Sequence, residues 1–310
     1  MSLLKVKDLS IVFPVAKGNV YAVSNVSFDL SEGESFGIIG ESGSGKSVIS
    51  LAILKLLPKY AIVSGSIYFN DIELLGPKGN NMRDIRGLQI SLIPQNPSGS
   101  LNPVLNNGVQ ISEVYEKQGI TRKEGFKKSI DMMGRFLLKD PQKLIKQYPH
   151  QLSGGMKQRL LASIALSFKS SLLIADEPTK GLDPEARRKS IDLLMKIKKE
   201  YGGSMLLITH DLDLAREICD RIAVMYAGEI VEIGRAEKVV DSPSHPYTKG
   251  LVGALPRNGL IPLEGQSPSR TNLPAGCLFS ERCKYRERKC AETHPEAGEI
   301  DGGIVRCHLY

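Results

Sequence analysis

A glycine-rich segment between a short apolar run and a helical pattern holds residue types suited to binding a phosphate chain. It reads Gly40-Glu41-Ser42-Gly43-Ser44-Gly45-Lys46-Ser47 and fits the pattern G-x-x-x-x-G-K-[ST]. Glycines let the backbone curl so that its N–H groups point at phosphate oxygens, and the positive end of the following helix favours the same anion. Lys46 adds a point charge for the β- and γ-phosphates, and Ser47 offers a hydroxyl ligand for Mg²⁺. These eight residues are predicted to bind a nucleotide together with Mg²⁺.

A second motif is an apolar strand that ends in two acids. The run Leu172 to Ala175 is followed by Asp176 and Glu177. At the end of a strand, Asp176 can hold the Mg²⁺ shell, while Glu177 can polarise the water that attacks the γ-phosphate. An acidic pair alone is often a solvated turn, but together with the phosphate-binding segment it predicts nucleotide hydrolysis.

The third motif, Leu152-Ser153-Gly154-Gly155-Met156, identifies a family resemblance. A serine and two glycines at the start of a helix make a second anion-binding turn. With the three motifs in this order, the sequence resembles the ATP-binding subunits of ABC transporters, whose signature is LSGGQ. The resemblance implies that Ser153, Gly154 and Gly155 act on the ATP of a partner subunit, so that two chains enclose two ATP molecules. Met156 replaces the usual glutamine and leaves the anion-binding backbone unchanged.

The same resemblance implies roles for residues that would mean little alone. Gln95 matches the glutamine that contacts Mg²⁺ and the attacking water, at the junction between the core and a helical insertion. His210 matches the switch histidine that hydrogen-bonds the γ-phosphate. Asp183 matches the D-loop aspartate, and it is also placed to cap the next helix. Phe13 is the expected adenine-stacking aromatic, with Tyr21 as its alternative.

The C-terminal residues narrow the resemblance and carry four cysteines. Residues 244–251, Ser-His-Pro-Tyr-Thr-Lys-Gly-Leu, resemble the C-terminal region of oligopeptide and dipeptide importer ATPases. Some members of that subfamily carry a [4Fe-4S] cluster, which implies this role for Cys277, Cys283, Cys290 and Cys307. Zinc, with His294 or His308 as nitrogen ligands, and a segment with no metal remain open. Disulfides are not expected in a cytosolic protein. Cys219 lies on an apolar helix face and is predicted to be a buried small hydrophobe.

The elements expected around these motifs form an α/β fold. Alternating residues predict antiparallel strands at 3–13 and 20–30, and strands at 35–39, 171–175 and 204–209 alternate with helices at 46–57, 184–199 and 211–219, before a hairpin at 221–233. We predict the α/β fold of a P-loop NTPase, the ABC ATPase fold, with a mixed sheet core, N-terminal antiparallel strands, a helical insertion and a small loop-rich C-terminal unit. The predicted ATP-binding domain spans residues 1–241, with the insertion at about 96–167. The C-terminal region spans residues 242–310.

Length, composition and charge limit the classes of function. The 310 residues include 41% hydrophobic and 24% charged residues, which is typical of a globular chain. No apolar run approaches the roughly 18 to 20 residues of a membrane span, and the N-terminus lacks a secretory pattern, so a cytoplasmic protein is expected. The net charge of +7 could serve nucleic acid, but with no tryptophan and 6% aromatics there is little for base stacking. Nucleic acid is therefore not an expected partner.

The resemblance predicts an ATPase subunit of an importer at the cytoplasmic face of the membrane, taking up oligopeptides or dipeptides. It implies a second ATPase subunit, identical or related, two membrane permeases and an extracytoplasmic substrate-binding protein. Nickel or another small solute is the alternative substrate, since substrate is chosen by other subunits. A soluble ABC ATPase acting on nucleic acid or the ribosome is a weaker alternative, because such proteins usually have fused nucleotide domains or long coiled-coil insertions. Regulation or redox sensing by the cysteine-bearing segment is a further alternative.

Overall fold

The computed structural model describes residues 2–16, 18–76, 82–201 and 203–310, which form two compact units. Unit 1 consists of Met1–Asn80 together with Leu207–Tyr310, and unit 2 is Asn81–Leu206. The chain therefore leaves unit 1, forms unit 2 and returns to unit 1.

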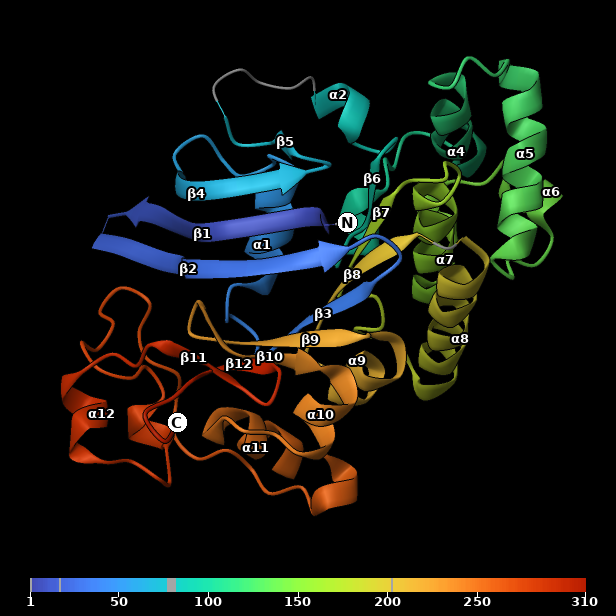
Figure 1. Cartoon of the computed structure of the whole chain (residues 1–310). Coiled ribbons are helices and arrows are strands. Elements are labelled where there is room, and N and C mark those ends of the chain that lie inside the picture. The colour runs from blue at the N-terminus through green and yellow to red at the C-terminus, as the bar shows by residue number, and fades with distance from the viewer. Residues whose placement is uncertain (1, 17, 77–81, 202) are drawn as a thin grey trace. The chain divides into compact units, whose positions relative to one another are not determined.

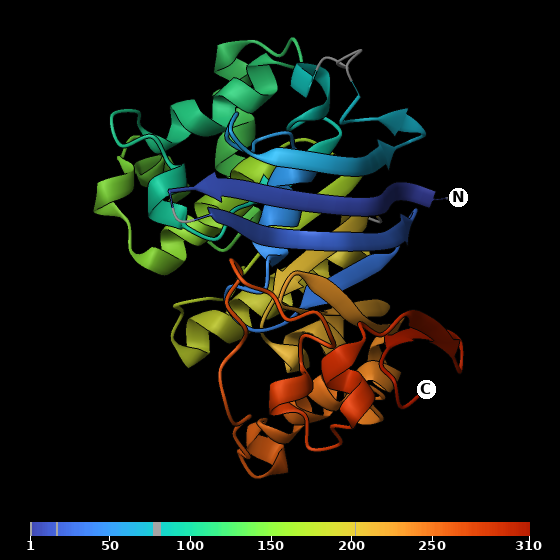
Figure 2. The same cartoon turned by 90° about the vertical axis from the view of Figure 1, so that its left-hand side faces the viewer.

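The first sheet of unit 1 is antiparallel and contains the two predicted N-terminal strands. β1 (Ser2–Val15) pairs with β2 (Gly18–Ser31) on one side and with β4 (Ile62–Phe69) on the other, and β5 (Ile72–Glu73) pairs with β4. The long blue strands lie side by side in both views (Figures 1 and 2). Leu4, Val6, Leu9 and Ile11 on β1 are buried, as expected for a sheet with one covered face. The predicted antiparallel pairing of the two N-terminal strands is confirmed.

The other strands of unit 1 have the order β11-β12-β10-β9-β3. β3 (Ser35–Ile39) runs parallel to β9 (Arg221–Tyr226), whereas β10 (Glu229–Arg235) pairs antiparallel with both β9 and β12 (Gly303–Arg306), and β12 with β11 (Ala297–Ile300). Ala227 and Gly228 both have positive φ, which suits the tight turn between β9 and β10. Parallel and antiparallel pairs thus coexist, which confirms the predicted mixed sheet.

The helices of unit 1 lie mostly in the C-terminal part of the chain. They are α1 (Lys46–Ile53), α9 (Leu212–Ile218), α10 (Ala236–Asp241), α11 (Pro246–Gly253) and α12 (Arg288–Glu292), with 3-10 turns η2 (Pro256–Asn258) and η3 (Ser280–Arg282). Cys219, just after α9, is 7% exposed, which confirms its predicted burial. Because β12 pairs with β10, the C-terminal segment also adds strands to a sheet of unit 1.

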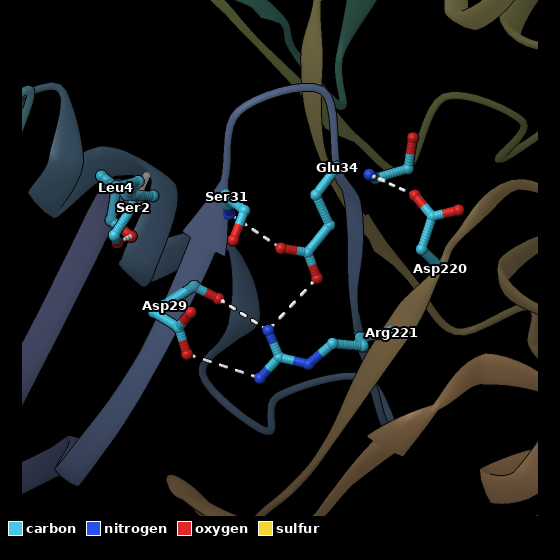
Figure 3. A network of polar contacts seen from close by, with 8 residues as sticks. Ser2, Leu4, Asp29, Ser31, Glu34, Asp220 and Arg221 are labelled. Carbon is cyan, nitrogen blue, oxygen red and sulfur yellow. Dashed lines mark hydrogen bonds and ion pairs between the residues drawn. The ribbon is translucent and has the colours of Figure 1, made fainter.

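A polar network joins the turn before β3 to the start of β9 (Figure 3). Arg221 donates from Nη1 to Oε1 of Glu34 at 3.2 Å and from Nη2 to Oδ1 of Asp29 at 3.4 Å. The other carboxylate oxygen of Glu34 accepts from the backbone N–H of Ser31 at 2.7 Å. Asp220 accepts from the N–H that opens β3, also at 2.7 Å. These bonds fix the start of β3, which leads into the phosphate-binding segment.

α11 begins at a buried histidine. The Nδ1 atom of His245 accepts a hydrogen bond from the backbone N–H of Tyr247 at 3.0 Å. The imidazole therefore caps the helix with an unprotonated Nδ1. Burial lowers the pKa of His245 to about 3, although a hydrogen bond with the backbone of Arg306 acts in the opposite direction. The folded side chain therefore stays neutral at mildly acidic pH.

We expect His245 to lower the free energy of unfolding by about 2 kcal/mol as the pH falls from about 7 to about 5. In the unfolded chain the imidazole takes up a proton below its usual pKa of 6.5, whereas the folded one does so only near pH 3. The unfolded state binds more protons in this window, so stability rises with pH there.

Denaturant unfolding of His245→Asn, measured across this pH range, checks the expectation, with exposed His150→Asn as the control. The asparagine keeps a capping acceptor but does not titrate, so the variant should lose the corresponding part of the pH dependence. A pH dependence equal to that of the wild type would show that His245 is not its source.

Unit 2 holds the predicted helical region and the strand with the two acids. Its elements are α2 (Met82–Ile85), β6 (Ile90–Ile93), α3 (Pro97–Ser100), α4 (Asn107–Glu116), α5 (Arg122–Arg135), α6 (Pro141–Leu144), η1 (Pro149–Gln151), α7 (Gly154–Ala165), β7 (Leu172–Asp176) and α8 (Pro184–Tyr201), while β8 (Ser204–Thr209) crosses the boundary between the units. β6 and β7 are parallel. The helices enclose an apolar core that includes Ile111, Met133, Leu144 and Leu160. Residues 96–167, all of them described, contain helices and loops, as the sequence predicts.

Membrane-spanning helices were not expected from the sequence. Within the described ranges, no helix combines the length and the apolar composition needed to cross a bilayer.

Candidate functional site

The phosphate loop of unit 1, residues 40–47, lies between β3 and α1, as the sequence predicts. Gly40 and Gly45 have φ values of 155° and 105°. A Cβ atom on Gly40 would stand 2.1 Å from the carbonyl oxygen of Met225, and one on Gly45 would stand 2.2 Å from that of Ala22. Both positions therefore require glycine, because backbone from two other strands approaches the loop closely.

Lys46 places its ammonium inside the phosphate loop. The side chain is 5% exposed, and Nζ donates to the carbonyl oxygens of Gly40 at 2.7 Å and Glu41 at 2.8 Å. Gly45 is the N-cap residue of α1 and has no side chain with which to cap the start of the helix. A buried ammonium and the start of a helix in one loop form a site suited to a phosphate chain.

The two candidates for adenine stacking lie on β1 and β2. Phe13 is half-buried, and its ring makes an edge-type contact with the ring of Tyr60, with the centroids 6.3 Å apart. Tyr21 is exposed, and its backbone N–H donates to the carbonyl oxygen of Arg270 at 3.0 Å. Sequence analysis missed Tyr60, which comes from the segment before β4 and carries no motif. Both predicted aromatics are accessible, and the choice of Phe13 remains a prediction.

His210 is exposed and follows β8 directly, at the position expected for a switch histidine. The next residue, Asp211, caps α9, because its Oδ1 accepts from the backbone N–H of Leu214 at 3.0 Å. This cap fixes the start of the helix that follows His210. The role of His210 toward phosphate stays a prediction.

In unit 2, the two acids at the end of β7 are buried. All five residues of the strand are buried, and Asp176 and Glu177 are each only 6% exposed. Glu177 has a φ of 48°, a conformation that non-glycine residues adopt rarely and that is often found at functional sites. The alternative reading as a solvated turn is therefore wrong, and two buried carboxylates at a strand end fit a role with cationic groups.

The signature motif, residues 152–156, starts α7. Ser153 Oγ accepts a hydrogen bond from the N–H of Met156 at 3.4 Å, and Ser153 and Gly154 are exposed. Further along α7, Leu160 is buried in the helical core. The exposed start of a firmly packed helix can therefore be offered to an anion on another molecule.

Asp183 and Gln95 lie near the ends of other elements of unit 2. Asp183 Oδ1 accepts from the N–H of Glu185 at 3.1 Å, so it does cap α8. Gln95 is exposed, two residues after β6. The segment that follows it is tied to the signature helix, because Lys157 Nζ donates to Ser98 Oγ at 3.2 Å. No pattern in the sequence points to this link, which joins two motifs separated by about sixty residues.

The four cysteines of the C-terminal segment, here called the cysteine group, come together in unit 1. Cys277, Cys283, Cys290 and Cys307 are free and half-buried. Burial raises the pKa of the Cys277 thiol to about 11, and the three other thiols add to the shift. Its backbone N–H donates to the carbonyl oxygen of Cys290 at 2.8 Å. This proximity agrees with the common role that the resemblance implies for the four cysteines.

The two histidines considered as zinc ligands have other partners. His294 Nε2 lies 2.9 Å from a carboxylate oxygen of Glu229, and His308 Nε2 lies 2.8 Å from the carbonyl oxygen of Thr293. Among the described residues, no group of three or more histidines, cysteines, aspartates or glutamates is arranged to hold a metal ion. The predicted cluster and its zinc alternative are therefore not established by the structure.

The predicted residues are divided between the two units. Unit 1 carries Phe13, Gly40, Glu41, Ser42, Gly43, Ser44, Gly45, Lys46, Ser47, His210 and the cysteine group, whereas unit 2 carries Gln95, Ser153, Gly154, Gly155, Asp176, Glu177 and Asp183. Each set retains the local geometry that its motif requires.

Comparison with protein families and relatives agrees with this geometry. Residues 23–180 match the model of the ABC transporter family, and residues 231–290 match the oligopeptide/dipeptide transporter C-terminal region. Relatives include the dipeptide transport ATP-binding protein DppD of Bacillus subtilis, 41% identical over 99% of this chain and 94% of that protein. The oligopeptide transport ATP-binding protein OppD of Escherichia coli is 39% identical over 99% of this chain and 93% of that protein.

A solved structure gives the same fold. The dimeric post-hydrolysis state of the ATP-binding cassette MJ0796 bound to ADP and Pi has a TM-score of 0.67 and 27% identity, and the match covers 75% of this chain and 98% of that chain. A phosphate loop, buried acids at a strand end and a signature helix define an ATPase of the ABC class. Because the family model covers about half of the chain and the relatives cover almost all of it, the chain belongs to the ABC transporter family.

Proposed function

We propose that this ATPase powers the import of oligopeptides or dipeptides through partner permeases. The observation that carries the proposal is that an ABC-type phosphate loop and the oligopeptide/dipeptide transporter C-terminal region occur in one chain. Relatives named as dipeptide and oligopeptide transport ATP-binding proteins, similar along almost their whole length, support the choice of substrate. Peptide-dependent ATP hydrolysis by the assembled transporter tests it.

In this proposal the motif residues divide the work of hydrolysis. The phosphate loop and Lys46 bind the phosphate chain, and Phe13 stacks on the adenine. Glu177 accepts a proton from the attacking water, while His210 donates a hydrogen bond to the γ-phosphate. Oxygen-bearing side chains are the donors that Mg²⁺ prefers, and the ion would be held by Ser47, Gln95 and Asp176.

The signature motif would act on a second subunit. Ser153, Gly154 and Gly155 lie at an exposed helix start and would contact the γ-phosphate of a partner's ATP, with Asp183 close to the shared interface. We propose that the partner is a second ABC ATPase, identical or related, so that ATP closes the pair and hydrolysis reopens it. Alternating closure and opening would drive the permeases.

We further propose the setting of the complex. Two membrane permeases and an extracytoplasmic substrate-binding protein would complete it, and this subunit would lie peripherally at the cytoplasmic face. Residues 1–241 would form the ATP-binding domain, and residues 242–310 the C-terminal region that is typical of peptide importers.

The cysteine group is proposed to hold a [4Fe-4S] cluster. Four mutually interacting thiols provide the donor set of such clusters, and each thiolate would be stabilised by the iron it binds. When bound, the cluster would link distant parts of a loop-rich segment.

Protein purified without oxygen should contain about four iron atoms and four acid-labile sulfides per chain. Cys283→Ser should lose most of both, whereas Cys219→Ser, which changes a buried cysteine outside the group, should keep them. Iron and sulfide assays with the absorbance spectrum give the answer. Stoichiometric zinc without sulfide, or no metal in anaerobic protein, would contradict the proposal.

A further inference from the structure

Glu41 is an unexpected residue for a loop that binds a polyanion. It is the second residue of the phosphate loop, and its carboxylate is close enough to Lys46 for the charge of the ammonium to lower its pKa. An unpaired carboxylate at this position would repel the phosphates of ATP and compete with them for Lys46. The structure therefore has to neutralise Glu41 if the loop is to bind ATP well.

Arg282, which is 241 positions away in the sequence, neutralises this charge. Its Nη1 and Nη2 atoms donate to the two oxygens of the Glu41 carboxylate, each at 3.0 Å, and the Arg282 side chain is only 5% exposed. Ser267 Oγ adds a third hydrogen bond to the carboxylate at 3.0 Å. Burial acts to raise the pKa of Glu41, but the hydrogen bonds from Arg282 and Ser267 and the nearby positive charges outweigh it and lower the pKa. Glu41 is thus held as a paired carboxylate.

The guanidinium of Arg282 is held firmly on its other sides. Its Nε donates to the carbonyl oxygen of Glu264 at 2.9 Å, and its Cζ lies 5.7 Å from the ring centroid of Tyr226 and 5.8 Å from that of Phe279. Because its guanidinium is already held in place, Arg282 loses little conformational entropy when it forms two hydrogen bonds with a carboxylate. Arg282 therefore sets the position of Glu41 rather than following it.

The backbone at Glu41 is also fixed from the C-terminal part of the chain. Its N–H donates to the hydroxyl oxygen of Tyr247 at 3.0 Å, and Tyr247 is fully buried against Tyr226 and Phe279. The side chain and the backbone of one loop residue are thus both held by residues that follow position 240. Without these contacts the loop would have to be ordered by ATP itself, at the expense of affinity.

We propose that Arg282 is a positioning residue for ATP binding, which neutralises Glu41 and holds the phosphate loop ready for the phosphates. This inference rests on the proposed nucleotide site. It gives the C-terminal segment a direct influence on ATP affinity. Arg282 lies in η3 immediately before Cys283, and the backbone N–H of Ser280 in the same turn donates to the carbonyl oxygen of Cys277 at 3.0 Å. A disturbance of the cysteine group would therefore reach the loop through this turn.

Removal of the arginine charge should weaken ATP binding. For Arg282→Met in the full-length chain we expect the dissociation constant for ATP to rise about tenfold, as for one uncompensated charge roughly 10 Å from the phosphates at an effective dielectric constant of about 20. The loss should shrink at high salt, and it should appear in KM for ATP rather than in kcat. Arg257→Met is the matched control, because Arg257 pairs with Asp213 on the surface of the same unit, and it should bind ATP as the wild type does.

Neutralisation of the partner, Glu41, makes the test specific. Glu41→Gln removes the repelling charge and should bind ATP at least as tightly as the wild type. The double variant Glu41→Gln/Arg282→Met should return to within about threefold of the wild type, which a merely structural loss would not do. Wild-type affinity in Arg282→Met would overturn the inference, and so would a double variant as weak as the single one. Thermal unfolding of each variant confirms that it is folded, and Arg282→Gln, which also removes the charge but keeps a polar side chain, replaces Arg282→Met if the latter does not fold.

ATP-binding titrations of one more variant distinguish a failure of this inference from a failure of the proposed nucleotide site. Lys46→Ala should lose most of the affinity for ATP. If Lys46→Ala binds ATP as the wild type does, the nucleotide site itself is misplaced. If Lys46→Ala loses binding and Arg282→Met does not, only the inference about Arg282 is wrong.

Discussion

We expect Glu177→Gln to retain ATP but to hydrolyse it at least about a hundredfold more slowly than the wild type, because a neutral amide cannot accept a proton from the attacking water. The buried position of Glu177 at the end of β7 and its positive φ support this role. Glutamine has nearly the same shape, so ATP binding and folding should be unchanged. ATP should accumulate on the variant and hold it together with its ATPase partner.

Single-turnover and steady-state phosphate release, with nucleotide retention on a filter, measure this effect. Glu185→Gln is the control, since Glu185 is an exposed acid on α8 of the same unit that pairs with Lys189. It should hydrolyse ATP at the wild-type rate. Turnover at the wild-type rate by Glu177→Gln would show that another group activates the water.

Ser153→Arg should abolish hydrolysis, by about a hundredfold or more, while leaving ATP binding by the isolated chain intact. The start of α7 is exposed, and a large side chain there would occupy the place of the partner's γ-phosphate. Ser153 is not among the residues proposed to bind the chain's own ATP, so the variant leaves those residues unchanged.

Thr121→Arg provides a matched control for the loss of a helix cap. Thr121 caps α5 through a 3.4 Å bond to the N–H of Glu124, as Ser153 caps α7 through a bond of the same length. Each replacement removes about 1 kcal/mol of capping stabilisation, but only Ser153→Arg should stop hydrolysis. Unchanged turnover in Ser153→Arg with its ATPase partner would refute a role for the signature at a shared site.

The motifs and their supporting elements could be predicted because their determinants are local. An apolar strand, a glycine-rich turn and a helix follow one another within residues 35–53, so sequence order alone specifies the phosphate loop. The buried strand that ends at Asp176 and the cap at Ser153 are local in the same way. Each of these features depends on neighbours only a few residues away.

Features that depend on distant pairing could not be predicted. β4 pairs with β1, and β12 pairs with β10, across long stretches of chain that carry no turn signal joining the two strands. The pairing of Glu41 with Arg282 is of the same kind, because an acid in a phosphate loop and an arginine beside a cysteine show no relation in the sequence. Tertiary packing decides such contacts, and a single sequence contains no pattern for them.

The central claim is tested most directly by ATP hydrolysis and solute uptake in liposomes that contain the full transporter, with its permeases, both ATPase subunits and its binding protein. The account predicts that a mixture of short peptides stimulates ATP hydrolysis, and that a labelled peptide accumulates inside only when ATP is supplied on the side of this subunit. Both effects should disappear with Glu177→Gln and persist with Glu185→Gln. Hydrolysis that ignores peptides, together with ATP-driven accumulation of nickel or another small solute but of no peptide, would contradict it.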